Sequence, residues 1–325
     1  MKNNSPILIV LGEPYSIFLE LIFKVFKSNY FLKIKRPIIL IGSQKLLNGQ
    51  MNKLGYRFKI NKVAQDELEI NAIHNRSLNI INVNFNHQKP FDKITNNSNK
   101  YISNCFSIAL NLIKKNKNMS LINGPISKKN FLKNKFLGIT EYLAQRTSRK
   151  GKVAMLIYNK ELSVSPITTH LPLKIVHKNL TKNKIIHHVK LIIDFYQKRF
   201  KKKPKIAITG LNPHCESNYK SSEENNIIIP AIKILNKKKN KISGPFAADT
   251  IFIRENTKKY DVIIGMYHDQ VLTPAKTLFG FNAINITLGL PFIRISPDHG
   301  PNVSMLGKNI SNPSSLIESL KFLNR

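Results

Sequence analysis

Short apolar runs that alternate with longer amphipathic segments are the feature that most constrains the fold of this chain. The runs have the length and composition of buried strands, and the segments between them carry apolar residues at helical spacing. The expected strands are Pro6–Leu11, Pro37–Gly42, Leu78–Val83, Met119–Asn123, Val153–Tyr158, Ile206–Gly210, Asp261–Met266 and Ala283–Thr287. The expected helices are Ser16–Lys27, Asn99–Lys117, Lys182–Arg199, Glu223–Lys237 and Asn312–Leu323. This order predicts an α/β fold with mainly parallel sheet, interrupted by short antiparallel strands around Leu162–Val176.

Length and residue usage limit the classes of protein that remain. A chain of 325 residues is long enough for two packed domains. It has no apolar run of 18 residues, so no membrane span is expected. Ile7–Leu11 is too short for a signal peptide and is interpreted as a first strand. The two cysteines, Cys105 and Cys215, predict no disulfide framework, and a cytoplasmic location is expected.

The charge is unusual, because 52 Lys and Arg stand against 18 Asp and Glu, a formal net charge of +34. Such an excess can indicate nucleic-acid binding. The lysines are, however, scattered among asparagines and isoleucines along the whole chain and form no single basic tail or stripe. No specific nucleic acid is therefore expected as a partner, although the positive field would attract anionic substrates and dinucleotides.

Polar clusters follow three of the expected strands directly. They are Gly124–Lys128, Leu211–His214 and Tyr267–Gln270. Ligands of open α/β sheets bind beyond the carboxyl ends of the strands. The three clusters are therefore predicted to lie in one region, which is the candidate active site.

Three of the nine histidines occupy such strand ends: His170, His214 and His268. Three imidazoles that converge from separate elements would suit a divalent metal, with positions left open for substrate. Each alone is more often a hydrogen-bonded structural histidine, and only the joint pattern makes a metal site as favoured as that interpretation. The histidines at 74, 87, 187 and 188 lie in polar or helical surroundings and are expected at the surface.

A second set, Lys276, Asn285 and Arg294, recurs at steps of nine residues. Two cations and an amide suit a phosphate or carboxylate, and Arg can bind two oxygens at once. A third cluster runs over Ser296–Gly300 and continues to Gly307–Pro313, where glycines would let backbone N–H groups approach a nucleotide. The chain contains no G-x-G-x-x-G, so an ordinary Rossmann cofactor site is not predicted.

Several blocks of the sequence resemble the 4-hydroxythreonine-4-phosphate dehydrogenase family of vitamin B6 biosynthesis. They span about residues 120–300 and comprise Asn123–Lys128, Thr168–Leu173, Gly210–His214, Gly244–Thr250, Met266–Gln270, Asn285–Arg294 and Asp298–Gly300. The resemblance implies an isocitrate/isopropylmalate-dehydrogenase-like fold. It has two α/β/α lobes with mainly parallel sheets and an active-site cleft between the lobes. Residues 1–125 and 285–325 would form the first lobe, on the NAD side. Residues 126–284 would form the second, with the metal histidines and the dimer contacts.

The same resemblance implies roles for individual residues. The metal ligands would be His170, His214 and His268, drawn from both subunits of a homodimer. Thr140, Lys276, Asn285 and Arg294 would bind the small phosphorylated substrate, and Asp298, His299 and Gly300 would lie beside NAD or NADP. Lys276 is also a candidate general base. Asp249 and Asp269 are candidates to orient the ligand histidines, or else helix-cap or turn residues. The metal would be Zn, Mg, Co or Mn.

The implied reaction is oxidation of 4-phosphooxy-L-threonine at C3 by NAD, followed by loss of CO2. The chain departs from the family pattern at Ile139, where the family has a histidine, over Gly12–Glu20, and over Pro301–Ser304. Ile139 leaves open a dehydrogenase of the same fold that acts on phospho-erythronate or phospho-threonate. A basic nucleic-acid-binding protein on a decayed enzyme scaffold is a further alternative from another class.

Overall fold

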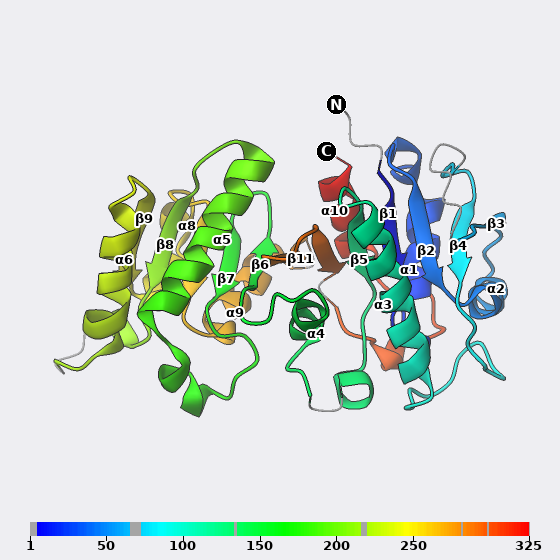
Figure 1. Cartoon of the computed structure of the whole chain (residues 1–325), viewed down its shortest axis with the longest axis horizontal. Helices are drawn as coiled ribbons and strands as arrows, with labels where there is room; N and C mark the ends of the chain where they lie inside the picture. Colours follow the sequence, from blue (N-terminus) through cyan, green and yellow to red (C-terminus); the bar gives the residue numbers. More distant parts are fainter. Residues whose placement is uncertain are drawn as a thin grey trace. The chain divides into compact units, whose positions relative to one another are not determined.

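The computed structural model describes residues 5–65, 73–132, 135–215, 220–280, 282–297 and 299–324. The chain divides into two compact units, unit 1 with Met1–Ile139 and Pro291–Arg325, and unit 2 with Thr140–Leu290 (Figure 1). These boundaries lie later than the expected 125/126 and 284/285. Asn99 donates to the backbone of Asn130, which keeps the segment after residue 125 in unit 1. Strand β11 (Ile284–Leu288) pairs with a strand of unit 2.

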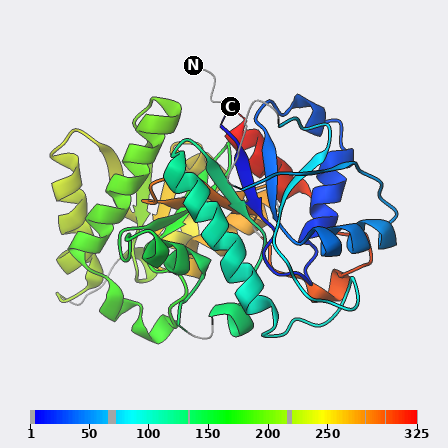
Figure 2. The same ribbon diagram turned by 45° about the vertical axis from the view of Figure 1, so that its right-hand side comes forward.

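Unit 1 contains a parallel sheet of order β3-β4-β2-β1-β5-β12. Its strands are β1 (Ile7–Val10), β2 (Ile38–Gly42), β3 (Ile60–Lys62), β4 (Leu78–Asn82), β5 (Ser120–Asn123) and β12 (Arg294–Pro297). Its helices are α1 (Phe18–Lys27), α2 (Gln44–Lys53), α3 (Ser98–Lys115) and α10 (Ser314–Leu323). Helix α1 contacts α2 and α10, so the two ends of the chain lie side by side, whereas α3 contacts β1 and β2 (Figures 1 and 2).

Unit 2 contains the mixed strand order β11-β6-β7-β10-β8-β9. The remaining strands are β6 (Ala154–Tyr158), β7 (Ser163–Pro166), β8 (Lys205–Thr209), β9 (Lys241–Phe246) and β10 (Val262–Gly265). Strands β7, β10, β8 and β9 run parallel, and β6 is antiparallel to both β7 and β11. The helices are α4 (Ile139–Arg146), α5 (Lys182–Phe200), α6 (Ile229–Asn236), α7 (Ala248–Ile251), α8 (Arg254–Thr257) and α9 (His268–Phe279). The predicted α/β class with mainly parallel sheet is confirmed.

Burial explains why the expected strands form. Every residue of β1, β2, β5 and β10 is buried, as the continuous apolar runs of a sheet covered on both faces require. In unit 2, Val271, Leu272 and Ala275 of α9 pack on Val164 and Ile263 of the sheet. None of the helices in the described part of the chain is both long and apolar enough to cross a membrane.

Two local expectations are wrong. Over Leu162–Val176 the described residues form one strand rather than several: β7, which is antiparallel to β6 as expected, ends at Pro166, and Pro166 and Pro172 cannot donate to a ladder. His188 is not a surface residue: it is 5% exposed on α5, with Nε2 2.6 Å from the Ser165 hydroxyl. Burial, with the charges of Lys184 and His187, lowers the pKa of His188 to about 3, so it is a neutral core histidine. Both cysteines are free, as expected.

The ends of β1 and β5 approach too closely for a side chain at Gly12. Its φ is +73°, and an added Cβ would lie 2.5 Å from the carbonyl oxygen of Pro125. Gly55 has nearly the same φ, +75°, with nothing within 4 Å of that position. We expect Gly55→Ala to cost about 1 kcal/mol of unfolding free energy from backbone strain alone. Gly12→Ala should cost about 3 kcal/mol, because it adds the steric clash. Urea unfolding of both variants tests this, and equal losses would contradict the close approach.

Candidate active site

The three predicted metal ligands lie at one edge of the unit 2 sheet. His170 follows β7, His214 follows β8, and His268 is the first residue of α9 after β10. Because these strands are parallel neighbours in the order β7-β10-β8, their carboxyl ends point the same way. Of the three polar clusters predicted to lie in one region, Leu211–His214 and Tyr267–Gln270 share this edge in unit 2, whereas Gly124–Lys128 belongs to unit 1.

Two of the three imidazoles lie together. The ring centroids of His170 and His268 are 5.6 Å apart. His214 has a left-handed backbone, with φ at 55°, and its side chain is 73% exposed. Within the described part of one chain, no group of three or more His, Cys, Asp or Glu is placed to hold a metal ion.

Carboxylates lie near two of the histidines. The His268 Nδ1 lies 2.6 Å from an oxygen of Asp269, and the His214 Nδ1 lies 3.9 Å from an oxygen of Asp249. A carboxylate that accepts from Nδ1 fixes the ring so that Nε2 can bind a metal. The imidazoles and their carboxylates thus form a donor set that fits a divalent metal.

Thr168 and Gln270 join the three histidine loops, although the sequence analysis gave neither a role. The hydroxyl of Thr168 donates to the Met266 carbonyl, 2.7 Å away, and so links the His170 and His268 segments. The amide of Gln270 donates to the Gly210 carbonyl at 2.8 Å and accepts from Met266 N–H at 2.7 Å. Thr168 lies in the motif Thr168–Leu173 and Gln270 in the motif Met266–Gln270, so membership of these motifs was the sequence signal for both residues.

Glu224 holds the loop before His214 and was also missed. It is buried, and one of its oxygens accepts from the N–H groups of Leu211 and Asn212, at 2.7 and 2.9 Å. Burial alone would raise the pKa of Glu224, but hydrogen bonds, foremost those from Asn212, outweigh it and lower the pKa. Glu224 therefore stays ionised and anchors the loop. The sequence signal for Glu224 was weak, because the segment that contains it was predicted only to be a helix.

The predicted substrate residues occur in both units. Thr140 is buried at the start of α4 beside Ile139, Lys276 is exposed on α9, and Asn285 lies on β11. The side-chain oxygen of Asn285 is buried and has no hydrogen-bond partner among the described residues. Such an atom is suited to accept a hydrogen bond from a ligand.

Arg294 belongs to unit 1 and is completely buried at the start of β12. Its Nε donates to the side-chain oxygen of Asn123, 2.8 Å away, at the end of β5. The predicted contact of Arg294 with a phosphate or carboxylate would use the donor geometry of its guanidinium, which can bind two oxygens at once.

The segment expected beside the cofactor also lies in unit 1. Asp298 falls outside the described residues. The His299 ring lies 6.1 Å from the ring of Phe18, and the Pro301 carbonyl accepts from the N–H of Ile17 at 3.2 Å. The chain after β1 and the segment with His299 and Gly300 are therefore neighbours.

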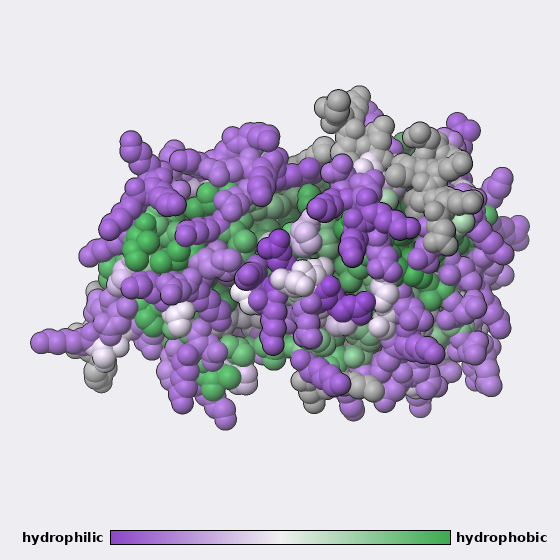
Figure 3. Space-filling view, viewed as in Figure 1, coloured by the Kyte–Doolittle hydropathy of each residue, from purple (hydrophilic) through white to green (hydrophobic). Residues whose placement is uncertain are grey.

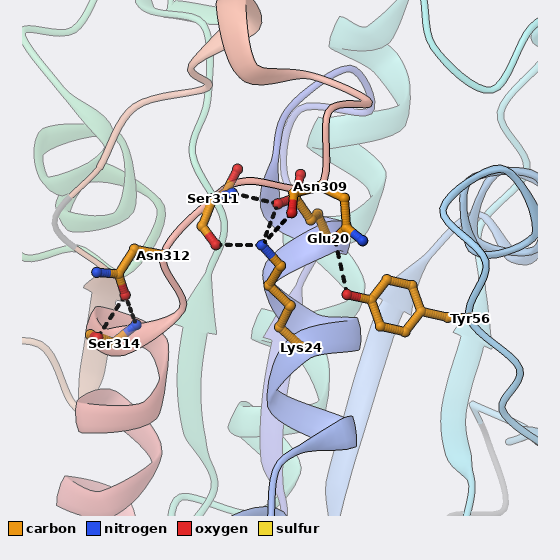
Figure 4. A network of polar contacts seen from close by, with 7 residues as sticks. All are labelled: Glu20, Lys24, Tyr56, Asn309, Ser311, Asn312 and Ser314. Carbon is orange, nitrogen blue, oxygen red and sulfur yellow. Dashed lines mark hydrogen bonds and ion pairs between the residues drawn. The ribbon is translucent and has the colours of Figure 1, made fainter.

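A polar network on α1 fixes the loop that follows Gly300 (Figure 4). The Lys24 ammonium donates to Glu20 at 2.9 Å and to the carbonyls of Asn309 and Ser311 at 3.0 and 2.7 Å. Glu20 in turn accepts from the N–H of Ser311 at 2.6 Å, and Tyr56 donates to the side chain of Asn309 at 2.9 Å. This network gives Glu20, the end of the altered Gly12–Glu20 stretch, a structural role.

Lys24→Met is expected to loosen this loop, because it leaves two carbonyls and the buried Glu20 carboxylate without their cation. We expect a loss of about 2 kcal/mol in unfolding free energy and faster amide hydrogen exchange in the loop around Ser311. Lys115→Met, at an exposed position on α3, is the matched control. Unchanged exchange at Ser311 would show that Lys24 does not hold the loop.

Comparison with known proteins agrees with these features. The model of the family "Pyridoxal phosphate biosynthetic protein PdxA" matches residues 33–323. The chain is 38% identical over 317 residues to the 4-hydroxythreonine-4-phosphate dehydrogenase of Sulfurihydrogenibium sp. (strain YO3AOP1), covering 96% of this chain and 95% of that one. It is 34% identical over 330 residues to the enzyme of that name from Aquifex aeolicus (strain VF5), covering 98% of each.

Solved structures give the same result. The crystal structure of 4-hydroxythreonine-4-phosphate dehydrogenase from Klebsiella pneumoniae superposes with a TM-score of 0.83 at 25% identity, covering 98% of this chain and 96% of that one. An isocitrate dehydrogenase from Methylococcus capsulatus, at 10% identity and a TM-score of 0.50, shares the fold over 96% of this chain and 83% of its own. The resemblance seen in the motifs is confirmed, and the chain belongs to the family of the pyridoxal phosphate biosynthetic protein PdxA, the 4-hydroxythreonine-4-phosphate dehydrogenases.

Proposed function

We propose that this protein catalyses the NAD-dependent oxidation of 4-phosphooxy-L-threonine at C3, followed by decarboxylation to 3-amino-2-oxopropyl phosphate, in vitamin B6 biosynthesis. The observation that carries the proposal is the near full-length match to dehydrogenases named for this substrate, 38% identical over 96% of the chain. The placement of the site residues supports it. His170, His214 and His268 share one sheet edge, and the sequence predicts Arg294, buried at the start of β12, as an anion-binding residue.

The chain's own residues would bind and orient the substrate. Arg294, held by Asn123, would take two oxygens of the phosphate or carboxylate, and the unpartnered oxygen of Asn285 would accept from a substrate hydroxyl or amino group. Lys276, on the same helix as His268, is the candidate to accept the C3 hydroxyl proton at Nζ. When bound, NAD or NADP supplies the hydride acceptor, and the divalent metal (Zn, Mg, Co or Mn) supplies the charge that acidifies the hydroxyl.

We propose a cytoplasmic homodimer in which both subunits contribute to each metal site. The separation of His214 from the His170–His268 pair within one chain supports a shared site. Closed twofold symmetry would create two identical sites per dimer. The basic charge spread along the chain fits an anionic substrate, and hydrophilic side chains are distributed over the face seen in Figure 3 rather than gathered in one stripe.

A dehydrogenase of phospho-erythronate or phospho-threonate is the second candidate, favoured by one observation. Ile139, which replaces a family histidine, begins α4 next to Thr140 and removes a polar group there. The purified protein should be assayed for NADH formation with 4-phosphooxy-L-threonine and with phospho-erythronate, each with Zn, Mg, Co and Mn. We expect turnover of the first substrate. Turnover of phospho-erythronate alone would overturn the biosynthetic assignment.

A further inference from the structure

The carboxyl group of Glu13 is buried at the end of β1 without a normal hydrogen-bond partner. The residue is 2% exposed, and neither carboxylate oxygen makes a hydrogen bond of ordinary length and angle with any described residue. Burial raises the pKa of Glu13 to about 7, although the Ser98 hydroxyl and the backbone of Ser127 and Tyr15 are near enough to lower it in part. Buried polar groups in proteins nearly always have partners, so this one calls for an explanation.

The surrounding loops hold Glu13 in place. An added Cβ on Gly124 would lie 2.4 Å from the carbonyl oxygen of Leu11, so the ends of β1 and β5 are in direct backbone contact. Glu13 N–H donates to the Pro125 carbonyl at 2.9 Å, and the Gln50 amide donates to the Pro14 carbonyl at 3.1 Å. These contacts fix the backbone on both sides of Glu13.

Its position in the sheet is one at which α/β proteins bind ligands. From β1 the chain passes through α1 to β2 on one side, whereas β5 lies on the other side of β1. This is a topological switch point, and ligands bind outside the carboxyl ends of strands at such points. The same loop touches the segment proposed to lie beside the cofactor, through Ile17 with Pro301 and Phe18 with His299.

We propose that the Glu13 carboxylate binds the dinucleotide cofactor, by accepting a hydrogen bond from one of its hydroxyl or amide donors at the ends of β1 and β5. This inference rests on the proposed function, which requires NAD or NADP. The ribose hydroxyls and the nicotinamide carboxamide of a dinucleotide are the donors available. An ionised carboxylate is a stronger acceptor than a neutral one, so cofactor binding releases the proton that Glu13 holds near neutral pH.

Other ionisable groups lie around Glu13. Burial raises the pKa values of Tyr15 on the same loop and of Tyr101 and Cys105 on α3, so all three stay neutral. The charge of Asp92 acts on Tyr15. His299 lies against the same loop, with its ring 6.1 Å from that of Phe18, and histidine is the side chain type that most often changes charge between pH 5 and 8. A His299→Gln variant therefore serves to separate the two groups.

Fluorescence titration with NADH, and in parallel with NADPH, tests the proposal at pH 6, 7 and 8. For the wild-type protein we expect the Kd of the bound nucleotide to fall about tenfold from pH 6 to pH 8, following ionisation of Glu13. Glu13→Gln should bind about tenfold more weakly at pH 8 and lose the pH dependence. Glu13→Asp should keep the pH dependence, as should His299→Gln. Glu161→Gln, at an exposed carboxylate in unit 2, should match the wild type.

The outcomes distinguish this inference from the proposed function. Wild-type-like affinity and pH dependence in Glu13→Gln would overturn the role of Glu13 and leave the dehydrogenase assignment intact. Loss of the pH dependence in His299→Gln instead would assign the titration to His299 and likewise overturn it. Absence of NADH and NADPH binding by the wild-type protein would contradict the assignment of NAD or NADP as the cofactor, and with it the proposed function. Circular dichroism of each variant establishes that it is folded.

Discussion

His268→Ala should lower NADH formation roughly a thousandfold and abolish tight binding of a divalent metal, because the metal contributes several kcal/mol to catalysis. The imidazole of His268 stands between two partners, the His170 ring at 5.6 Å and the Asp269 carboxylate at 2.6 Å. Its loss therefore disrupts the best-organised part of the donor set. Metal content after purification and NADH absorbance measure the two effects. His177→Ala, at an exposed histidine of unit 2, is the control and should be indistinguishable from wild type.

A mixing experiment tests the shared site directly. If His170 and His268 of one subunit act with His214 of the other, then His214→Ala and His268→Ala homodimers are both inactive. A heterodimer of the two retains one intact site. Random co-assembly of equal amounts should then restore about a quarter of wild-type activity, since half of the dimers are mixed and each has one of two sites. No recovery, despite heterodimers isolated through two different tags, would mean that one chain supplies all three ligands.

Glu13→Gln is expected to stabilise the protein at pH 8 by about 3 kcal/mol while leaving it nearly unchanged at pH 4.5. The pKa of Glu13 is raised from 4.5 to about 7 in the folded protein. A carboxyl group with a raised folded pKa favours folding below its unfolded pKa, where it is protonated in both states. That advantage is lost as pH rises from 4.5 to 7, because the unfolded chain ionises first. The amide side chain of the Glu13→Gln variant does not ionise, so the variant does not lose this unfolding free energy as the pH rises.

Urea unfolding at pH 4.5, 6 and 8 checks this prediction. Other groups titrate over the same range, so the informative quantity is the difference in unfolding free energy between the variant and the wild type at each pH. Glu161→Gln, with its carboxylate exposed, should show no such difference. A constant difference across the three pH values would mean that Glu13 is ionised at pH 4.5 in the folded protein and that its burial has no electrostatic cost.

The sequence predicted the elements whose signal is local. All eight expected strands occur within one or two residues, because continuous apolar runs bury in a covered parallel sheet whatever lies beside them. The missed strands have other compositions. Strands β3 (Ile60–Lys62) and β9 (Lys241–Phe246) are partly exposed edges that contain polar residues, and β12 begins with the completely buried Arg294. In each case the neighbouring strand, rather than the residues themselves, decides the conformation.

For the site, the sequence by itself determined the family and the position of His170, His214 and His268 at strand ends, next to other polar residues. Only the tertiary structure decided which of them meet. The strand order β7-β10-β8 and the left-handed backbone at His214 bring His170 to His268 and leave His214 beside Asp249. The burial of Glu13 was likewise beyond the sequence. The burial of Glu13 depends on the contact between the ends of β1 and β5, which are more than a hundred residues apart in the sequence. Contacts between such distant residues leave no local sequence pattern.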